Sequence, residues 1–240
     1  MIISRTPLRI SFFSGGSDMP NFYEKEKGAA LSVTINKYIY VMMHKTPHLG
    51  IKIMYDTIEE FPDLETMQHA ITRESLKHFG IDKEVTIASI ADILAKGSGL
   101  GSSSAFTIGL VNVLANPDQH SSLVSREYLA QTAYMIERQM CGYPVGKQDQ
   151  YASAYGGMNL FEFHKDDSVE IKPLTYNRET WGNLEDRLLL VYSGRGRNAN
   201  SILQKQAAAM SDEVKFDLVR RSRDKAYVAC RYLKENKLDD

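Results

Sequence analysis

The stretch GSGLGSSSA, Gly97 to Ala105, decides how the rest of this 240-residue chain is interpreted. It lies between an expected strand, Val85–Ile93, and an expected apolar helix, Ser103–Leu114. Three glycines at alternating positions let the backbone approach a ligand, and the amides at a helix start present positive potential. This arrangement suits a phosphate group. The loop has no lysine before its last hydroxyl, as a Walker A loop requires, and Ser102 replaces the third glycine of GxGxxG.

The three serines of this loop leave several interpretations open. In the plainest one, the segment is a flexible Gly/Ser turn and one serine only caps the helix, which stabilises it by about 1 kcal/mol. A second interpretation has one hydroxyl ligating Mg²⁺, which prefers oxygen ligands. A nucleophilic serine is disfavoured, because the sequence has no GxSxG motif and no histidine near the loop.

Composition limits the classes of function. The chain is 43% hydrophobic and 25% charged, which is typical of a globular protein. Its 29 Lys and Arg against 30 Asp and Glu give a net charge of −1, which argues against nucleic acid or an anionic membrane as partner. The N-terminus does not resemble a signal peptide, and Cys141 and Cys230 form no CxxC or zinc-type cluster. We therefore expect a cytoplasmic protein with reduced cysteines and no membrane span.

Hydrophobic patterning predicts an α+β fold, because strands come first and helices follow. Asn36-Lys37 is interpreted as a hairpin tip, Ser125 as a helix N-cap, and the polar segment Tyr176–Glu185 as a boundary between domains. The expected strands are Leu8–Phe13, Leu31–Ile35, Tyr38–Met43, Ile51–Tyr55, Val85–Ile93, Met158–Phe163, Val169–Pro173 and Leu188–Tyr192. The expected helices are Leu64–Phe79, Ser103–Leu114, Ser125 to Met140, a short piece after Gly146, and most of the C-terminal end.

The glycine-serine loop resembles the nucleotide loop PxxxGLGSSSA of the GHMP kinase superfamily. GLGSSSA is intact from Gly99 to Ala105, and Ala95 replaces the proline. Two further segments resemble motifs of this family. TPLRISFFSGGSDMP, Thr6 to Pro20, has an arginine followed nine residues later by an aspartate, and ERQMCGYPVGKQDQ has a glutamate and an aspartate twelve residues apart. These pairs are Arg9 with Asp18 and Glu137 with Asp149.

The resemblance implies a role for each motif. ATP phosphates would bind the loop formed by Gly97, Ser98, Gly99, Leu100, Gly101, Ser102, Ser103 and Ser104. Ser103 and Glu137 would hold Mg²⁺, and Asp149 would orient the attacking hydroxyl as the catalytic residue. Arg9 would neutralise the transferring phosphoryl group and stabilise the charge of Asp149. The sugar would bind the turn formed by Gly15, Gly16, Ser17 and Asp18.

Each of these residues also has a structural interpretation. Glu137 could be an exposed helical glutamate in an ordinary ion pair, and Asp149 could cap a short helix. Asp18 could form only an Asx-turn. Capping and catalysis by Asp149 are compatible.

Within the superfamily, RTPLRISF, GGSD and GSGLGSSSA most resemble the D-glycero-D-manno-heptose 7-phosphate kinases, with L-fucose kinases also similar. VYSGRGRNANSILQ, Val191 to Gln204, resembles the TGxxRxA region of the heptose kinases. Arg195 and Arg197 on that glycine-rich segment, and Lys147, could contact a substrate phosphate. Two solvated surface arginines are the alternative. Three tyrosines could line the sugar pocket or pack in the core: Tyr143, Tyr151 and Tyr155.

The resemblance implies a two-domain GHMP kinase fold. Residues 1–185 would form an ATP- and sugar-binding domain like domain 2 of ribosomal protein S5. Residues 186–240 would begin a ferredoxin-like C-terminal domain that is expected to be incomplete, because the family's third motif, GxGGGG, does not occur. The apolar surface exposed by such a loss would favour self-association, so a homodimer is an expected partner.

The implied function is transfer of the ATP γ-phosphoryl group to a hydroxyl, expected to be anomeric, of D-glycero-D-manno-heptose 7-phosphate. The small-molecule substrate and ATP with Mg²⁺ are the expected ligands. The alternatives are a kinase for fucose or galactose and a catalytically silent sensor that binds sugar and nucleotide.

Overall fold

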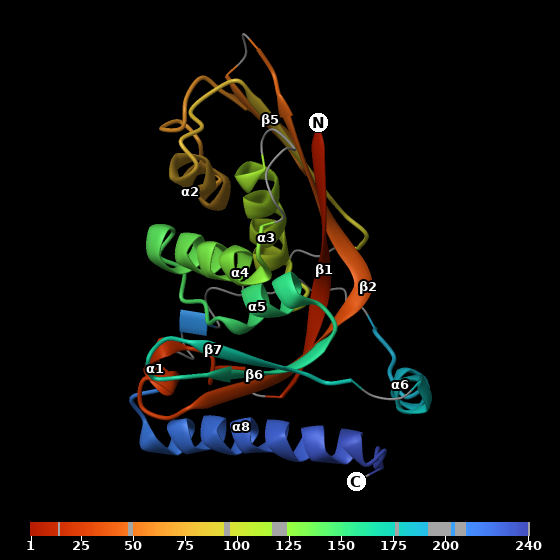
Figure 1. Cartoon of the computed structure of the whole chain (residues 1–240). Coiled ribbons are helices and arrows are strands. Elements are labelled where there is room, and N and C mark those ends of the chain that lie inside the picture. The colour runs from red at the N-terminus through yellow and green to blue at the C-terminus, as the bar shows by residue number, and fades with distance from the viewer. Residues whose placement is uncertain are drawn as a thin grey trace.

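One mixed β-sheet with helices packed on it forms the framework of this protein in the computed structural model (Figure 1). The structure describes residues 1–13, 15–47, 50–93, 97–116, 124–175, 178–191, 203–204 and 210–239. The strand order is β4-β3-β5-β2-β6-β7, and β1 pairs with β2. The α+β class expected from the sequence is confirmed.

The strands and helices follow the chain in this order. The strands are β1 (Ile2–Phe13), β2 (Gly28–Lys45), β3 (Ile51–Met54), β4 (Ile58–Phe61), β5 (Val85–Ala91), β6 (Met158–Phe163) and β7 (Val169–Pro173). The helices are α1 (Pro20–Tyr23), α2 (Ala70–His78), α3 (Ser102–Ala115), α4 (Arg126–Met135), the π-helix η1 (Ile136–Met140), α5 (Gln148–Tyr155), α6 (Arg178–Glu185) and α8 (Glu213–Lys234).

Strand β2 runs through the whole sheet, so the hairpin predicted at Asn36-Lys37 is wrong. These residues lie in a bulge: Tyr38 pairs with Pro7 and Thr34 with Arg9, which leaves three residues of β2 opposite one residue of β1. A bulge bends a strand and changes its pairing without ending it, and polar residues are tolerated there. Beyond it, β2 pairs with β5 on one side of the bulge and with β6 on the other. The bulge therefore lies directly beside Arg9.

The upper half of the sheet in Figure 1 is covered on one face by α2 and α3. Helix α3 packs apolar residues such as Leu110 and Val113 against Val41 of β2. At Gly109 a Cβ would lie 2.9 Å from a methyl group of Val41, so glycine permits this close approach of helix and strand. This packing fixes the start of α3, where the glycine-serine loop ends.

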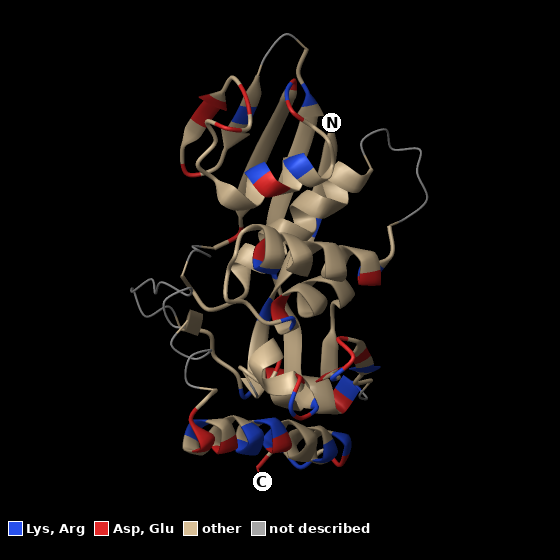
Figure 2. Cartoon of the chain, turned by 90° about the vertical axis from the view of Figure 1, so that its left-hand side faces the viewer, with Lys and Arg blue, Asp and Glu red and all other residues tan. Residues whose placement is uncertain are grey.

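The lower half of the sheet is covered on both faces. Since side chains alternate along a strand, Ala30 and Phe161 face α5 while Leu31 and Met158 face α8. Helix α8 meets the sheet with one apolar stripe, Ala226, Cys230 and Leu233. Figure 2 shows charged residues of both signs along the rest of α8.

Three other predictions from the sequence differ from the structure. Leu188–Val191, predicted as part of a strand, follows a turn after α6 and forms no strand; its side chains are 49–86% exposed, and Tyr192 lies outside the described residues. Helix α2 begins only at Ala70, because His69 caps it by accepting from Thr72 N. The helix expected from Ser125 to Met140 has the predicted N-cap but continues as the π-helix η1 from Ile136.

Residues 186–240 lie partly outside the described part of the chain, and the boundary at 185 remains a prediction. Helix α8 packs on the same sheet as the N-terminal elements. In the described ranges, no helix combines the length and the apolar character needed to cross a membrane.

Candidate functional site

Arg9 and Asp149, 140 residues apart in the sequence, form a two-pronged ion pair. Arg9 Nε donates to Asp149 Oδ1 at 2.8 Å, and Arg9 Nη2 donates to Oδ2 at 2.7 Å. The third guanidinium nitrogen, Nη1, donates to the carbonyl oxygen of Gly99 at 2.6 Å. Arg9 is 11% exposed and Asp149 is 32% exposed, so the pair lies at a surface that solvent can reach. One guanidinium group thus joins the glycine-serine loop to the first turn of α5.

The glycine-serine loop needs its glycines for their backbone conformation. Gly97, Gly99 and Gly101 all have φ between 72° and 78°, a region that favours glycine. Gly101 is the N-cap of α3, so the serine N-cap considered above is wrong. The first helical hydrogen bond runs from Ala105 N to Gly101 O at 2.9 Å. The amides of the three serines before it have no partner inside the helix, which is the arrangement that binds anions.

Glu137 is a fully buried carboxylate that faces the start of α3. Its Oε1 accepts from Ser103 Oγ and its Oε2 from Ser104 Oγ, both at 2.8 Å, and Oε2 also accepts from Gln150 Nε2. Burial raises the pKa of Glu137, and the charge of Asp149 adds to this, while the three hydrogen bonds oppose it. The exposed helical glutamate considered as an alternative is therefore wrong. A π-helix, rare in proteins and frequent at functional sites, carries this residue.

The donor set around Glu137 fits a divalent cation. Among the described residues, every group that donates a hydrogen bond to Glu137 is neutral, and two of them are hydroxyls whose oxygens are themselves candidate ligands. Hard cations such as Mg²⁺ prefer this oxygen chemistry. Ser104 was assigned only to phosphate binding from the sequence, yet its side chain reaches Glu137 as Ser103 does.

Asp18 connects the predicted sugar-binding turn to the segment before Asp149. Its Oδ1 accepts from Gly16 N at 3.0 Å and its Oδ2 from Gln148 N at 3.1 Å. In an Asx-turn the carboxylate would accept from an amide two residues later in the chain, whereas Asp18 accepts from Gly16, which precedes it, and from the distant Gln148. The Asx-turn considered as an alternative is therefore wrong. Burial raises the pKa of Asp18, with a further contribution from the charge of Asp149, while its bonds to backbone amides lower it.

Ser17 and Gly15 belong to the same turn but differ in what they offer a ligand. Ser17 is fully buried, and its hydroxyl donates to Ala29 O at 2.9 Å and accepts from Ala29 N at 3.1 Å. This side chain fixes the turn to β2. Gly15 is exposed and has open space where a side chain would stand.

Lys147, considered above as a contact for a substrate phosphate, is bound to another residue of the chain. Its side chain is 4% exposed, and its ammonium group is bonded to Asp167. The signal for this pairing is absent from the sequence, because Asp167 lies on the turn between β6 and β7. Arg195 and Arg197, the other predicted phosphate contacts, lie outside the described residues.

The three tyrosines follow the packing interpretation. Tyr151 and Tyr155 stack with ring centroids 6.1 Å apart, and both hydroxyls donate to Glu127. Tyr143 is half-buried against the upper core. Sequence reasoning missed Gln150, which bonds Glu137 from the helix that carries Asp149; its only signal was its place next to that aspartate.

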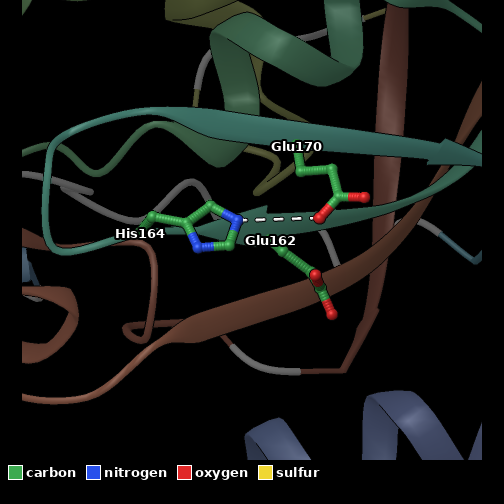
Figure 3. A group of neighbouring side chains, drawn as sticks. All are labelled: Glu162, His164 and Glu170. Atoms are coloured by element: carbon green, nitrogen blue, oxygen red, sulfur yellow. Dashed lines mark ion pairs between the residues drawn. The ribbon is translucent and has the colours of Figure 1, made fainter.

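A second group of side chains that could hold a metal lies on β6 and β7, away from the glycine-serine loop. Figure 3 shows Glu162, His164 and Glu170, whose ligand atoms lie within 4.8 Å of one another. Glu162 is already paired with Lys172 at 2.7 Å and Lys27 at 3.1 Å. These lysines neutralise the carboxylate, so the group is a structural ion-pair cluster.

Taken together, the geometry joins an anion-binding helix start, a buried carboxylate with two hydroxyls, and an arginine paired with an accessible aspartate. Such a site can hold a polyphosphate, neutralise its charge and orient a hydroxyl group toward it.

Comparison with known proteins identifies related sequences. Residues 65–157 match the family described as GHMP kinases N terminal domain. The D-glycero-alpha-D-manno-heptose 7-phosphate kinase of Campylobacter jejuni is 30% identical over 230 residues, which cover 88% of this chain and 65% of that protein. A bifunctional fucokinase/GDP-fucose pyrophosphorylase of Arabidopsis thaliana is 27% identical over 83% of this chain and 21% of its own length. The chain thus spans less than two thirds of the length of either relative.

Solved structures agree with these relatives. A D-glycero-D-manno-heptose 1-phosphate kinase from Bacteriodes thetaiotaomicron superposes with a TM-score of 0.78 at 25% identity, over 99% of this chain and 74% of that one. Streptococcus pneumoniae phosphomevalonate kinase superposes with a TM-score of 0.72 at 14% identity, over 99% and 75% of the two chains, and shares the fold.

Proposed function

We propose that this chain, of which residues 65–157 match the family described as GHMP kinases N terminal domain, serves an ATP-dependent kinase that phosphorylates a hydroxyl of a sugar or sugar phosphate. The proposed acceptor is D-glycero-D-manno-heptose 7-phosphate, and the proposed position is its anomeric hydroxyl. The observation that carries the proposal is the contact of Arg9 with both Gly99 O and the Asp149 carboxylate.

Phosphoryl transfer depends on positioning and charge neutralisation more than on covalent chemistry by the protein. In the proposed site the amides of the glycine-serine loop hold the ATP phosphates. Asp149 accepts a hydrogen bond from the attacking hydroxyl and orients it, because its carboxylate is accessible while Arg9 fixes its plane. Arg9 also stabilises negative charge on the transferring group.

Glu137 with Ser103, and with Ser104 beside it, would hold Mg²⁺. When bound, Mg²⁺ neutralises charge on the nucleotide phosphates. Burying a carboxylate among neutral donors is costly, and a cation would offset that cost.

The choice of a heptose phosphate is supported by the two most informative similarities, to heptose phosphate kinases at 30% and 25% identity. Asp18, with Gly15 and Gly16, is the proposed sugar-binding turn, and Arg195 and Arg197 are the proposed contacts for the substrate's own phosphate. The cytoplasm remains the proposed compartment.

The similarity to a fucokinase at 27% identity favours L-fucose as a second candidate acceptor. Fucose carries no phosphate, so the two candidates differ in whether a basic contact to the acceptor is needed.

The test is ADP release by the chain with ATP, Mg²⁺ and each of four acceptors: heptose 7-phosphate, fucose, galactose and mevalonate. We expect release only with the heptose phosphate, and ³¹P NMR of the product should show an anomeric phosphate. Turnover with fucose alone would move the assignment to the second candidate. Binding of sugar and nucleotide without any turnover would contradict the kinase proposal and favour a sensor.

A further inference from the structure

Lys147 is a buried cation placed two residues before Asp149. Its Nζ donates to the main-chain oxygen of Asp167 at 2.5 Å and to Asp167 Oδ1 at 2.6 Å. The ammonium group also lies over the rings of Tyr23, at 4.9 Å from the centroid, and Tyr134, at 5.4 Å. Lysine is almost never buried without partners, so these contacts explain why this one is stable.

Asp167 is suited to act as an anchor. It lies in the turn between β6 and β7 with φ of 69°, and its amide bonds back to His164 O at 3.1 Å. Its Oδ1 also accepts from Tyr23 OH at 2.7 Å. Lys147 is therefore held by a sheet turn, by α1 and by α4 at once.

The backbone on either side of Lys147 holds Asp18. Lys147 N donates to Asp18 O at 3.2 Å, and Gln148 N donates to Asp18 Oδ2 at 3.1 Å. Gly146 lies so close that a Cβ there would be 2.0 Å from Asp18 Oδ2. Residues 146–148 therefore connect the two aspartates of the site, Asp18 and Asp149.

We propose that Lys147 is a positioning residue: by binding the Asp167 turn, it fixes the distance between Asp18 and Asp149, and so the place of the acceptor sugar relative to Asp149. This inference rests on the proposed function. The Lys147 side chain is only 4% exposed and its ammonium group is bonded to Asp167, so its effect would pass through the backbone of residues 146–148. A change of about 1 Å in the position of the sugar relative to Asp149 can lower the rate of phosphoryl transfer about 100-fold.

Two variants test this inference. Lys147→Met keeps the length and apolar stem of the side chain and removes its ammonium group. Asp167→Gly removes the carboxylate, which is 68% exposed, at a position whose positive φ glycine tolerates well, so it is the milder change to the fold. Lys27→Met is the matched control, because Lys27 also pairs with a carboxylate, Glu162, and lies over a tyrosine ring.

The first measurement is hydrogen exchange of peptides that cover residues 15–19 and 146–150, which needs no substrate. We expect both peptides to exchange faster in Lys147→Met and Asp167→Gly than in the unaltered chain, and unchanged exchange in Lys27→Met. Unchanged exchange in both test variants would overturn the inference.

The second measurement separates binding from turnover. For Lys147→Met we expect kcat to fall about 100-fold and KM for the sugar to rise, while Kd for nucleotide stays the same. A fall in nucleotide affinity equal to that in kcat would indicate general loss of structure and would overturn the positioning role. The unaltered chain could fail to transfer a phosphoryl group while the two variants still exchange faster. That result would support the positioning role of Lys147 and would contradict only the proposed function.

Discussion

At the scale of single residues, three neighbouring carboxylates are stabilised in three different ways. Asp149 is paired with Arg9, Asp18 accepts from backbone amides, and Glu137 accepts from neutral side chains. Burial raises the pKa of both Asp18 and Glu137, and the charge of Asp149 raises each further. Removing the charge of each residue should therefore have a different effect on activity.

Replacing Asp149 by Asn should lower kcat about 10²- to 10⁴-fold with little change in Kd for ATP, because the neutral amide is a weaker hydrogen-bond acceptor than the carboxylate and is not a base. Steady-state kinetics and nucleotide titration measure the two effects. Asp82→Asn, at an exposed position, is the control. Near-normal kcat in the Asp149 variant would remove this residue from the mechanism.

Replacing Glu137 by Gln should raise the Mg²⁺ concentration for half-maximal activity by about tenfold or more, since one anionic oxygen ligand is lost. Ser103→Ala should act in the same direction. The measurement is a Mg²⁺ titration at saturating ATP, with the exposed change Glu24→Gln as control. Superimposable titration curves would contradict the assignment.

Part of the site could be predicted from sequence because motif spacing specifies which residues recur together. The resemblance of three segments to one kinase family points to Arg9, Asp149, Ser103 and Glu137, and the structure pairs Arg9 with Asp149 and Ser103 with Glu137. The pairing of Lys147 could not be predicted, because α5 and β6 separate it from Asp167 in the sequence and no sequence pattern links a lysine to a turn on another element.

At the scale of elements, the start of α3 depends on a glycine that also makes room for Arg9. A Cβ at Gly101 would lie 3.1 Å from Arg9 Cγ, and the residue has φ of 72°. Backbone conformation and side-chain space therefore both select glycine here.

Gly101→Ala should weaken nucleotide binding and lower kcat, because it displaces Arg9 and strains the N-cap. Gly80→Ala is a matched control, with φ of 67° but open space around a Cβ. Both variants should lose about 1–2 kcal/mol of unfolding free energy from the left-handed backbone, measured by urea denaturation. Equal nucleotide affinity in the two variants would show that contact with Arg9 is unimportant.

The elements were best predicted where an apolar or alternating run ends at clear turn residues, as in β6 and β7. The hairpin at Asn36-Lys37 failed because polar residues also mark a bulge, and only the partner strand distinguishes the two. Leu188–Val191 failed because four consecutive apolar residues favour a strand only when another strand pairs with them.

At the scale of the whole molecule, α8 joins the C-terminal end of the chain to the N-terminal sheet. Leu233 packs in one core cluster with Leu31 and Met158, and all three line an apolar cavity of ≈ 410 Å³. The buried residues of α8 on this stripe are Ala226, Cys230 and Leu233.

Leu233→Ala should lower the unfolding free energy by about 2–5 kcal/mol, because it removes buried apolar volume beside an existing cavity. Leu218→Ala, 58% exposed on the same helix, should change it by less than about 0.5 kcal/mol. Urea denaturation of both variants checks the difference. Equal losses would indicate that α8 is not bound to the sheet through this stripe.

Acid stability should depend on Glu162, where β6, β7 and α8 meet. Burial raises its pKa, but the hydrogen bonds and positive charges of Lys172 and Lys27 outweigh this and lower the pKa from 4.5 to about 2. A lowered pKa means that ionised Glu162 stabilises the fold above pH 4.5, and that this stabilisation is lost as the pH falls through about 2.

Glu162→Gln should therefore be less stable than the unaltered chain at neutral pH, and its stability should fall less between pH 4.5 and pH 2. Urea denaturation across this pH range is the measurement. Glu170→Gln, 53% exposed beside the same Lys172, is the control. Parallel pH profiles for Glu162→Gln and the unaltered chain would contradict the role of this ion pair.

The unbroken course of β2 has a mechanical consequence. Since the same strand pairs with β5 on one side of the bulge and with β6 on the other, the proposed nucleotide-binding loop and the proposed acceptor-binding turn are both carried by elements that join one continuous strand. If the proposed substrates bind there, we expect segments outside the sheet to enclose them, and turnover should then tolerate stiffening of the strands far better than stiffening of the loops.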